Sequence, residues 1–314
     1  ACGCAHSVCL DANGSVWSFG DNHYGQLGVG DYETHKRPQQ VPVLNNIKSI
    51  SCGFLHTVCL DHQNRPWVFG HNIEGQLGLG DCTHRVFPQR MDLNDVHMVA
   101  CGKYYTLFLN GDGEVFACGG NSFGELGLGD KHRRMTPTRI KQLPTIISIA
   151  CGDDHSVFLG KYNVYSCGNN YSGQLGLGEA MQQFPMILKP RKLQIENICA
   201  VSCGFHHTML LDFSGGLWTC GFNAYGRLGL GDTVNRSQPE KISTFSNIRY
   251  ISTGGNHSVV QDAYGNIWSF GWNTASQLGI GDKENRFAPT KLPEEYAHII
   301  GEIPSRVKSA RNVY

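Results

Sequence analysis

Histidine and cysteine recur at a fixed spacing in this chain, and both residue types can bind metals or act in catalysis. The pattern Cys-Gly-x-x-His occurs four times, and two further copies replace one of its outer residues. The anchor glycines of the six copies are Gly3, Gly53, Gly102, Gly152, Gly204 and Gly254. Histidines carried one per repeat cannot all converge on one ion. We therefore expect buried imidazoles that are hydrogen-bonded to the backbone.

The thirteen cysteines follow the same repeat. Cys118, Cys167 and Cys220 occupy a position that holds phenylalanine in the other copies, which is typical of a buried apolar residue. The odd total and the lack of paired Cys-x-x-Cys spacing argue against a disulfide framework or a zinc site. Cys2 and Cys4 are the one close pair that leaves a metal alternative open. We expect reduced thiols, an intracellular (cytoplasmic or nuclear) protein, and neither a metal nor another cofactor.

Successive anchor glycines are 49 to 52 residues apart, and such a period predicts an array of like structural units. The content of 40% apolar and 17% charged residues is typical of a folded chain. Lysine plus arginine and aspartate plus glutamate number 26 each, which argues against a nucleic-acid or membrane-surface binder. No apolar stretch is long enough for a membrane helix. The predicted units are about 1–50, 51–99, 100–149, 150–201, 202–251 and 252–300.

Each unit is predicted to consist of short strands joined by turns. In the second, residues 56–60 alternate in polarity, residues 61–64 form a turn, and residues 66–69 form a second strand. One aromatic residue recurs in this second strand, which indicates core packing between neighbouring sheets. The six aromatics are Trp17, Trp67, Phe116, Tyr165, Trp218 and Trp268. Because no unit has a helical period, the chain is predicted to be all-β, with the short-strand pattern of a β-propeller.

A glycine-rich run follows the second strand, such as Gly75-Gln-Leu-Gly-Leu-Gly-Asp81 after Gly70-x-Asn72, and a proline comes before a further extended stretch. The run resembles a phosphate-binding loop, but no Gly-Lys-Ser/Thr and no helix follow it, so we interpret it as tight turns. Aspartate and arginine four residues apart predict a bridge that fixes the loop. These pairs are Asp81/Arg85, Asp130/Arg134, Asp232/Arg236 and Asp282/Arg286.

Together, the Cys-Gly-x-x-His anchor, the aromatic strand ending in Gly-x-Asn, the Gly-Gln-Leu-Gly-Leu-Gly-Asp run and the later proline resemble the regulator of chromosome condensation repeat. The resemblance covers residues 1 to about 292. It implies a β-propeller with four-stranded blades, usually seven, whereas six repeats are found here. We expect one propeller domain over 1–300, in which 296–300 supplies the missing first strand and closes six blades. Seven blades remain the alternative, and 301–314 is interpreted as a linker.

The fourth repeat departs most from the others. Its hairpin is one residue shorter, its loop aspartate is replaced by Glu179 with no arginine after it, and it holds a small basic cluster. Neutral drift in a loop would explain these differences, and a binding surface is the alternative. The cluster consists of Lys189, Arg191 and Lys192.

The founding member of the family exchanges guanine nucleotide on the Ran GTPase. It uses an aspartate directly before one anchor histidine and a second histidine within another anchor. The resemblance carries these roles to Asp154 and His206, while Asp153, Lys103 and Tyr104 are further binding candidates. Here the two anchors are in adjacent repeats, no insertion is long enough for that member's wedge hairpin, and its basic arm has no counterpart.

Two functions follow from the sequence. The first is a protein–protein interaction propeller, a scaffold or adaptor module cut from a larger protein, because no nucleophile–base pair or metal cluster is visible. The alternative is a guanine-nucleotide exchange factor for a Ran-like small GTPase, which needs no covalent chemistry. We expect a monomeric ring with a protein partner, and neither nucleic acid nor a membrane. Light sensing, as in the plant ultraviolet-B receptor, is not expected because no anchor holds tryptophan.

Overall fold

A computed structural model describes residues 1–181 and 183–293, in two compact units over Ala1–Asp154 (unit 1) and His155–Tyr314 (unit 2). In this part of the chain the helices are two three-residue 3-10 turns, η1 (Glu179–Met181) and η2 (Ala224–Gly226). None is long and apolar enough to span a membrane. The predicted closing strand at 296–300 and the linker at 301–314 lie outside the described residues.

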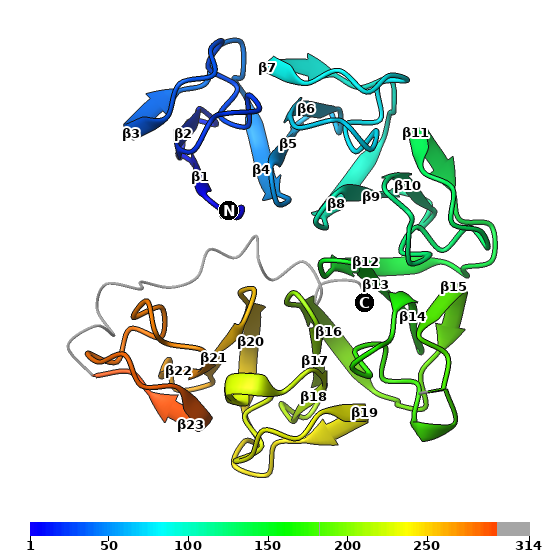
Figure 1. Cartoon of the computed structure of the whole chain (residues 1–314), viewed down its shortest axis with the longest axis vertical. Coiled ribbons are helices and arrows are strands. Elements are labelled where there is room, and N and C mark those ends of the chain that lie inside the picture. Colours follow the sequence, from blue (N-terminus) through cyan, green and yellow to red (C-terminus); the bar gives the residue numbers. More distant parts are fainter. Residues whose placement is uncertain (182, 294–314) are drawn as a thin grey trace. The chain divides into compact units, whose positions relative to one another are not determined.

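Unit 1 is built from short antiparallel strands, which Figure 1 shows in blue to green. The strands are β1 (His6–Leu10), β2 (Val16–Gly20), β3 (His35–Gln40), β4 (Ile47–Cys52), β5 (His56–Asp61), β6 (Pro66–Gly70), β7 (Arg85–Arg90), β8 (Val96–Cys101), β9 (Tyr105–Asn110), β10 (Val115–Gly119), β11 (Arg134–Arg139) and β12 (Ile146–Cys151). They form the sheets β1-β2-β3, β4-β5-β6-β7 and β8-β9-β10-β11, and β12 lies beside β8 and β9.

Unit 2 continues the same order of strands. These are β13 (His155–Gly160), β14 (Val164–Asn169), β15 (Met186–Lys192), β16 (Ile198–Cys203), β17 (His207–Asp212), β18 (Leu217–Gly221), β19 (Arg236–Lys241), β20 (Ile248–Thr253), β21 (His257–Asp262), β22 (Ile267–Gly271) and β23 (Arg286–Lys291). In sequence order they pair as β13-β14-β15, β16-β17-β18-β19 and β20-β21-β22-β23. Each repeat is one blade, which confirms the all-β propeller class with six blades.

The hairpin of each blade is set by its turn. In the second, Asp61 Oδ1 accepts hydrogen bonds from the backbone N–H groups of Gln63 and Arg65, both at 2.9 Å. The other oxygen, Oδ2, accepts from the indole N–H of Trp67 at 3.1 Å. The same carboxylate therefore fixes both the turn and the recurring aromatic residue. Trp67 also packs against a core cluster shared by the first two sheets, as the sequence predicted.

The hydrophobic clusters of the core lie between neighbouring sheets. The cluster between the second and third sheets contains Val58, Leu77 and Phe108 together with Cys118, which is fully buried. Cys167 and Cys220 are also fully buried. These positions confirm that cysteine replaces phenylalanine as an apolar core residue.

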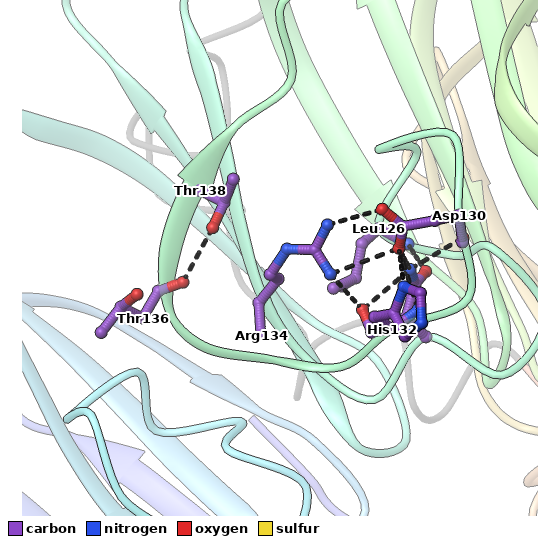
Figure 2. Close-up of polar contacts among 7 residues, drawn as sticks. Leu126, Asp130, His132, Arg134, Thr136 and Thr138 are labelled. Atoms are coloured by element: carbon purple, nitrogen blue, oxygen red, sulfur yellow. Dashed lines mark hydrogen bonds and ion pairs between the residues drawn. The ribbon is translucent and has the colours of Figure 1, made fainter.

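An asparagine organises the glycine-rich loop of each blade. The Asn121 side chain donates from Nδ2 to the Asp130 carbonyl at 3.0 Å, and its Oδ1 accepts from the Leu126 N–H at 3.0 Å. The Asp130 carboxylate is bound by the Arg134 guanidinium at 2.7 Å (Figure 2). Equivalent bridges at Asp81, Asp232 and Asp282 confirm the predicted loop-fixing pairs.

The anchor histidines connect each blade to the next, in a way that differs from the expectation. Four of them, His6, His56, His155 and His207, are buried as predicted, but their ring partner is a side-chain hydroxyl and not the backbone. The fifth, His257, is half-buried. His56 Nε2 lies 3.0 Å from Thr106 Oγ1, and Thr106 Oγ1 donates its one hydrogen to the Gln76 carbonyl at 2.8 Å. The hydroxyl oxygen must therefore accept from a protonated Nε2. Burial lowers the pKa of His56 to about 3, which keeps the ring neutral.

The anchor glycine provides the room for this ring. A Cβ added to Gly53 would lie 2.0 Å from Cε1 of His56, so any larger residue would displace the imidazole. The same bond recurs between His6 and Thr57 in unit 1, and between His207 and Ser258 in unit 2, each at 3.0 Å. The spacing of glycine and histidine is thus a packing requirement of the blade interface.

The repeated proline lies elsewhere than the sequence indicated. It was expected to precede the outer strand, but Pro38, Pro88 and Pro137 each lie within it, as the fourth residue of β3, β7 and β11. The outer strand is an edge of its sheet. Proline is accepted there because its missing N–H would face away from the ladder.

Candidate functional site

The two residues between each anchor glycine and the first strand after it differ from blade to blade. We call these pairs the anchor loops: residues 4–5, 54–55, 103–104 and 153–154 in unit 1, and residues 205–206 and 255–256 in unit 2. The backbone joins successive loops, because the Phe54 N–H donates to the Lys103 carbonyl at 3.4 Å and the Lys103 N–H to the Asp153 carbonyl at 3.1 Å. In unit 2, the Phe205 N–H donates to Gly255 at 3.0 Å. A constant backbone thus presents variable side chains.

Aromatic rings and one cation lie together in the anchor loops of unit 1. Lys103 Nζ is 5.4 Å from the ring centroid of Phe54 and 5.6 Å from that of Tyr104. The two rings meet edge to face, with centroids 6.0 Å apart. Lys103 and Tyr104, both predicted from the sequence, are therefore brought together with Phe54, which sequence reasoning missed. An aromatic pair and a cation are suited to protein recognition.

A histidine pair extends this surface, and it too was missed. The rings of His71 and His84 are stacked at 4.8 Å, and Tyr104 lies 5.6 Å from His71. Burial, and then the neighbouring His84, lower the pKa of His71 to about 4. A sequence signal for His71 was present, because the middle residue of Gly-x-Asn changes in every blade although the glycine and asparagine do not.

The carboxyl groups of the fourth anchor loop are unusual. Asp153 is 9% exposed, and neither its side chain nor that of Asp154 has a hydrogen bond or ion pair in the part of the chain that the structure describes. Burial, and then the charge of Asp154, raise the pKa of Asp153 to about 7. Burial also raises the pKa of Asp154, and Lys103 opposes the shift in both residues. These carboxyls would be relieved by a cation from outside.

The residue directly before Leu-Gly in each loop, which we call the glutamine position, also carries charge in two blades. It is Gln26, Gln76, Glu125, Gln174, Arg227 and Gln277 in the six repeats. The side-chain oxygen of Gln76 accepts from the Glu74 N–H at 3.1 Å, and its Nε2 lies 2.7 Å from Nδ1 of His71. The glutamine side chain therefore forms hydrogen bonds both with the backbone of its own loop and with His71, the middle residue of Gly-x-Asn.

Glu125 keeps the first of these roles. Its Oε2 accepts from the Phe123 N–H at 2.8 Å, while Gly120 stands where the second blade has His71. Glu125 is 4% exposed, and burial raises its pKa to about 7, with a smaller contribution from Asp154. Unit 1 thus gathers three buried or half-buried carboxyls around its third and fourth anchors.

Arg227, in unit 2, places a positive charge at the glutamine position. Its Nε donates to the Ala224 carbonyl at 3.1 Å and its Nη1 to Asn256 Oδ1 at 2.6 Å. Its guanidinium carbon lies 4.7 Å from the Phe222 ring and 5.8 Å from the Tyr225 ring. Burial lowers the pKa of Arg227 to about 10, so the group stays charged at neutral pH.

The remaining predicted residues lie in unit 2. The His206 ring meets Phe222 edge to face at 6.5 Å, so it belongs to the surroundings of Arg227. Lys189, Arg191 and Lys192 are exposed on β15, where Arg191 and Lys192 are opposite Ser166 and Tyr165. His155 pairs with Gly168 at the anchor end of the same sheet, so these two basic residues lie toward the hairpin end. The structure therefore does not bring them to the anchor loops.

In residues 1–181 and 183–293, no group of three or more His, Cys, Asp or Glu side chains is placed to hold a metal ion. Four of the five anchor histidines, His6, His56, His155 and His207, are committed to the blade interfaces. What the anchor loops offer is a surface of rings and charges, which can bind.

Comparison with known proteins gives the family. A family model for the RCC1-like domain matches residues 1–189, and models for the regulator of chromosome condensation (RCC1) repeat match residues 198–227, 214–261 and 264–311. The ultraviolet-B receptor UVR8 of Arabidopsis thaliana is 40% identical over 52 residues, 17% of this chain and 12% of the receptor. The E3 ubiquitin-protein ligase highwire of Drosophila melanogaster is 40% identical over 58 residues, 18% of this chain and 1% of the ligase.

Among solved structures, Prp20p from Saccharomyces cerevisiae superposes with a TM-score of 0.83 at 24% identity, over 93% of this chain and 76% of that one. This likeness concerns the fold. The curated relatives are matched over a small part of their length, whereas the family models reach from residue 1 to residue 311. The chain belongs to the regulator of chromosome condensation (RCC1) family of β-propellers.

Proposed function

We propose that this chain is a protein–protein interaction propeller whose anchor loops form the binding surface. The observation that carries the proposal is the contrast within each anchor. The glycine and histidine are fixed by the blade interface, whereas the two loop residues vary from blade to blade and backbone hydrogen bonds join one loop to the next. A rigid scaffold that presents variable side chains is how propellers and other repeat proteins bind partners.

The unit 1 loops are expected to hold the strongest contacts. Phe54, Lys103 and Tyr104 form a half-buried group of two rings and a cation, and such residues dominate the energy of many protein interfaces. Asp153 and Asp154 add negative charge beside them. A partner that contributes a cation there, in addition to Lys103, would relieve the cost of two largely buried carboxyls.

The test compares loop variants with a matched surface variant. Phe54→Ser and Tyr104→Ser should each weaken the affinity for a captured and purified partner by roughly 30-fold, a hot-spot effect of about 2 kcal/mol. Tyr32→Ser removes an equally apolar ring that is 54% exposed outside the anchor loops, and it should leave the affinity unchanged. If the loop variants bind every captured partner as well as wild type does, the anchor loops are not the binding surface.

A second function, guanine-nucleotide exchange on a Ran-like small GTPase, is favoured by one specific observation. Asp154, the residue that corresponds to the family's aspartate before an anchor histidine, is a half-buried carboxyl without a hydrogen bond in the described residues. A group held in this way is free to interact with a partner. Solved relatives include Prp20p, whose structure was described with its binding to Gsp1p and histones.

The experiment measures release of a fluorescent GDP analogue from Ran and other small GTPases, with substoichiometric amounts of this chain. Exchange activity predicts faster release, its loss in Asp154→Ala, and no fall in the melting temperature, because the residue makes no stabilising contact. Asp153→Asn is the matched control on the neighbouring residue. Absence of acceleration with every GTPase would reject this second function and leave the binding proposal in place.

A further inference from the structure

The glutamine position of the fifth blade holds a buried cation that the fold itself does not require. Four of the six blades have glutamine there, and glutamine satisfies the loop without charge. Arg227 is 1% exposed, and its partners are the Ala224 carbonyl, the Asn256 amide oxygen and two aromatic rings. In the described part of the chain it forms no ion pair with a carboxylate.

A buried charge without a counter-ion is costly, and proteins usually pair it. Arg227 lacks such a counter-ion at one amino group of its guanidinium. Nε and Nη1 are used by neutral acceptors, whereas Nη2 has no hydrogen bond in the described residues. The guanidinium therefore has one amino group left with which to bind an anion.

We propose that Arg227 receives the carboxylate of an aspartate or glutamate side chain on the partner protein, with Asn256 and Phe222 positioning the guanidinium. This inference rests on the proposed binding function. A carboxylate fits better than a phosphate, because one guanidinium matches a single negative charge and no other lysine or arginine contacts this group in the described residues.

Tyr225 lies beside the guanidinium. Its ring lies 5.8 Å from the guanidinium carbon and is 45% exposed, while its backbone has a φ of 66°. In the other blades the residue before the loop glycine donates its N–H to the side-chain oxygen at the glutamine position, for example Glu74 to Gln76 at 3.1 Å. Arginine cannot accept that bond, and here the loop forms η2 instead. The carboxylate reaches Nη2 when the Tyr225 side chain moves aside.

The test uses a defined probe, N-acetyl-hexaglutamate amide, and hexaglutamine as the uncharged control. Binding is measured by calorimetry at low ionic strength, because salt screens such contacts. Wild type should bind hexaglutamate and not hexaglutamine, and Arg227→Gln should weaken binding by roughly 10-fold or more. Arg227→Gln installs the residue of four other blades, so its melting temperature should not fall.

A second variant distinguishes anion binding by Arg227 from a purely structural role of this residue. Tyr225→Gly removes the covering ring and suits the positive φ, so hexaglutamate should bind more tightly than to wild type. Equal binding of hexaglutamate by wild type and Arg227→Gln would overturn the proposal. Preferential binding of inorganic phosphate over hexaglutamate would also overturn it, in favour of a phosphate site.

Failure of this inference and failure of the proposed function give different results. If Arg227→Gln still binds the purified partner fully while Phe54→Ser does not, the binding function stands and the carboxylate receptor is wrong. If no anchor-loop variant affects any partner but Arg227→Gln still loses hexaglutamate, the anion site exists and the proposed function is wrong.

Discussion

The third and fifth blades carry opposite charges at one and the same position of the fold. Glu125 in unit 1 and Arg227 in unit 2 both replace a glutamine, and both are almost completely buried. The glutamine of the second blade, Gln76, instead bonds its own loop and His71 without carrying a charge. The neutral residue suits the scaffold in four blades, so the two charges distinguish the third and fifth blades from the rest.

The scaffold around these two positions is the same in both units. The histidine–hydroxyl contact is 3.0 Å for His56 and Thr106 in unit 1, and 3.0 Å for His207 and Ser258 in unit 2. The loop asparagines also make the same bonds, so Asn121 and Asn223 each donate to their aspartate carbonyl at 3.0 Å. The difference in charge is therefore local to the loops and is not a change of fold.

The largest effect is expected when the charge at the fifth blade is reversed. Arg227→Glu places a carboxylate where Asn256 Oδ1 now accepts a bond, and it removes the contact with Phe222. The free energy of unfolding at pH 8 should fall by roughly 3 kcal/mol. Urea unfolding measures it, with Arg227→Gln as the control that stays within about 1 kcal/mol of wild type. A fully stable Arg227→Glu protein would mean that the position is indifferent to charge.

A smaller, pH-dependent effect is expected at the third blade. The folded-state pKa of Glu125, about 7, is above its ordinary value of 4.5, so the folded protein binds the proton more tightly than the unfolded chain. The stability contributed by this proton is complete below pH 4.5 and is lost as the pH rises through 7. Glu125→Gln should therefore be more stable than wild type at pH 8, by on the order of 2 kcal/mol, and similar to it at pH 4.5.

Urea unfolding across this range checks the prediction. Asp153, whose pKa is also raised to about 7, should continue to make the Glu125→Gln protein less stable as the pH rises. The double variant with Asp153→Asn should lose most of the remaining slope. A stability difference between wild type and Glu125→Gln that is constant with pH would show that Glu125 is not the titrating group.

The smallest effect is expected at positions that are alike in both units. The bridges Arg85–Asp81 in unit 1 and Arg286–Asp282 in unit 2 measure 2.6 and 2.5 Å and are partly exposed. Replacing either arginine with alanine should cost less than about 1 kcal/mol, because solvent screens such pairs. Thermal melting should shift equally in the two variants, and a clear inequality would show that the units also differ in their scaffold.

Much of the blade could be predicted because its requirements are local. The period-two strand that starts at His56, the turn at Asp61 and the second strand at Pro66 all lie where the sequence placed them. The aspartate–arginine pairs followed from a spacing of four residues. The prediction for the anchor histidine was half wrong, because its hydroxyl partner is about fifty residues away in the next blade and no local pattern names it.

The side chains of the anchor loops were predicted less completely, for the same reason. Asp154 was predicted from the family resemblance, Asp153 from its place in the same anchor, and Lys103 and Tyr104 from their place in the preceding anchor. Phe54 was overlooked because an apolar residue in one loop has no meaning until the next loop is placed beside it. The basic cluster on β15 was proposed because it interrupts the repeat, yet its register in the sheet takes Arg191 and Lys192 toward the hairpin end.

The sequence by itself determined the repeat, the family and the strand order, because glycine, aspartate, asparagine and alternating apolar residues act through backbone geometry within one blade. Tertiary structure alone decided which variable side chains meet, and whether a charge is buried. Burial depends on the neighbouring blade, and the loss of solvent is what shifts the pKa values of Glu125, Asp153 and Arg227 away from their ordinary range.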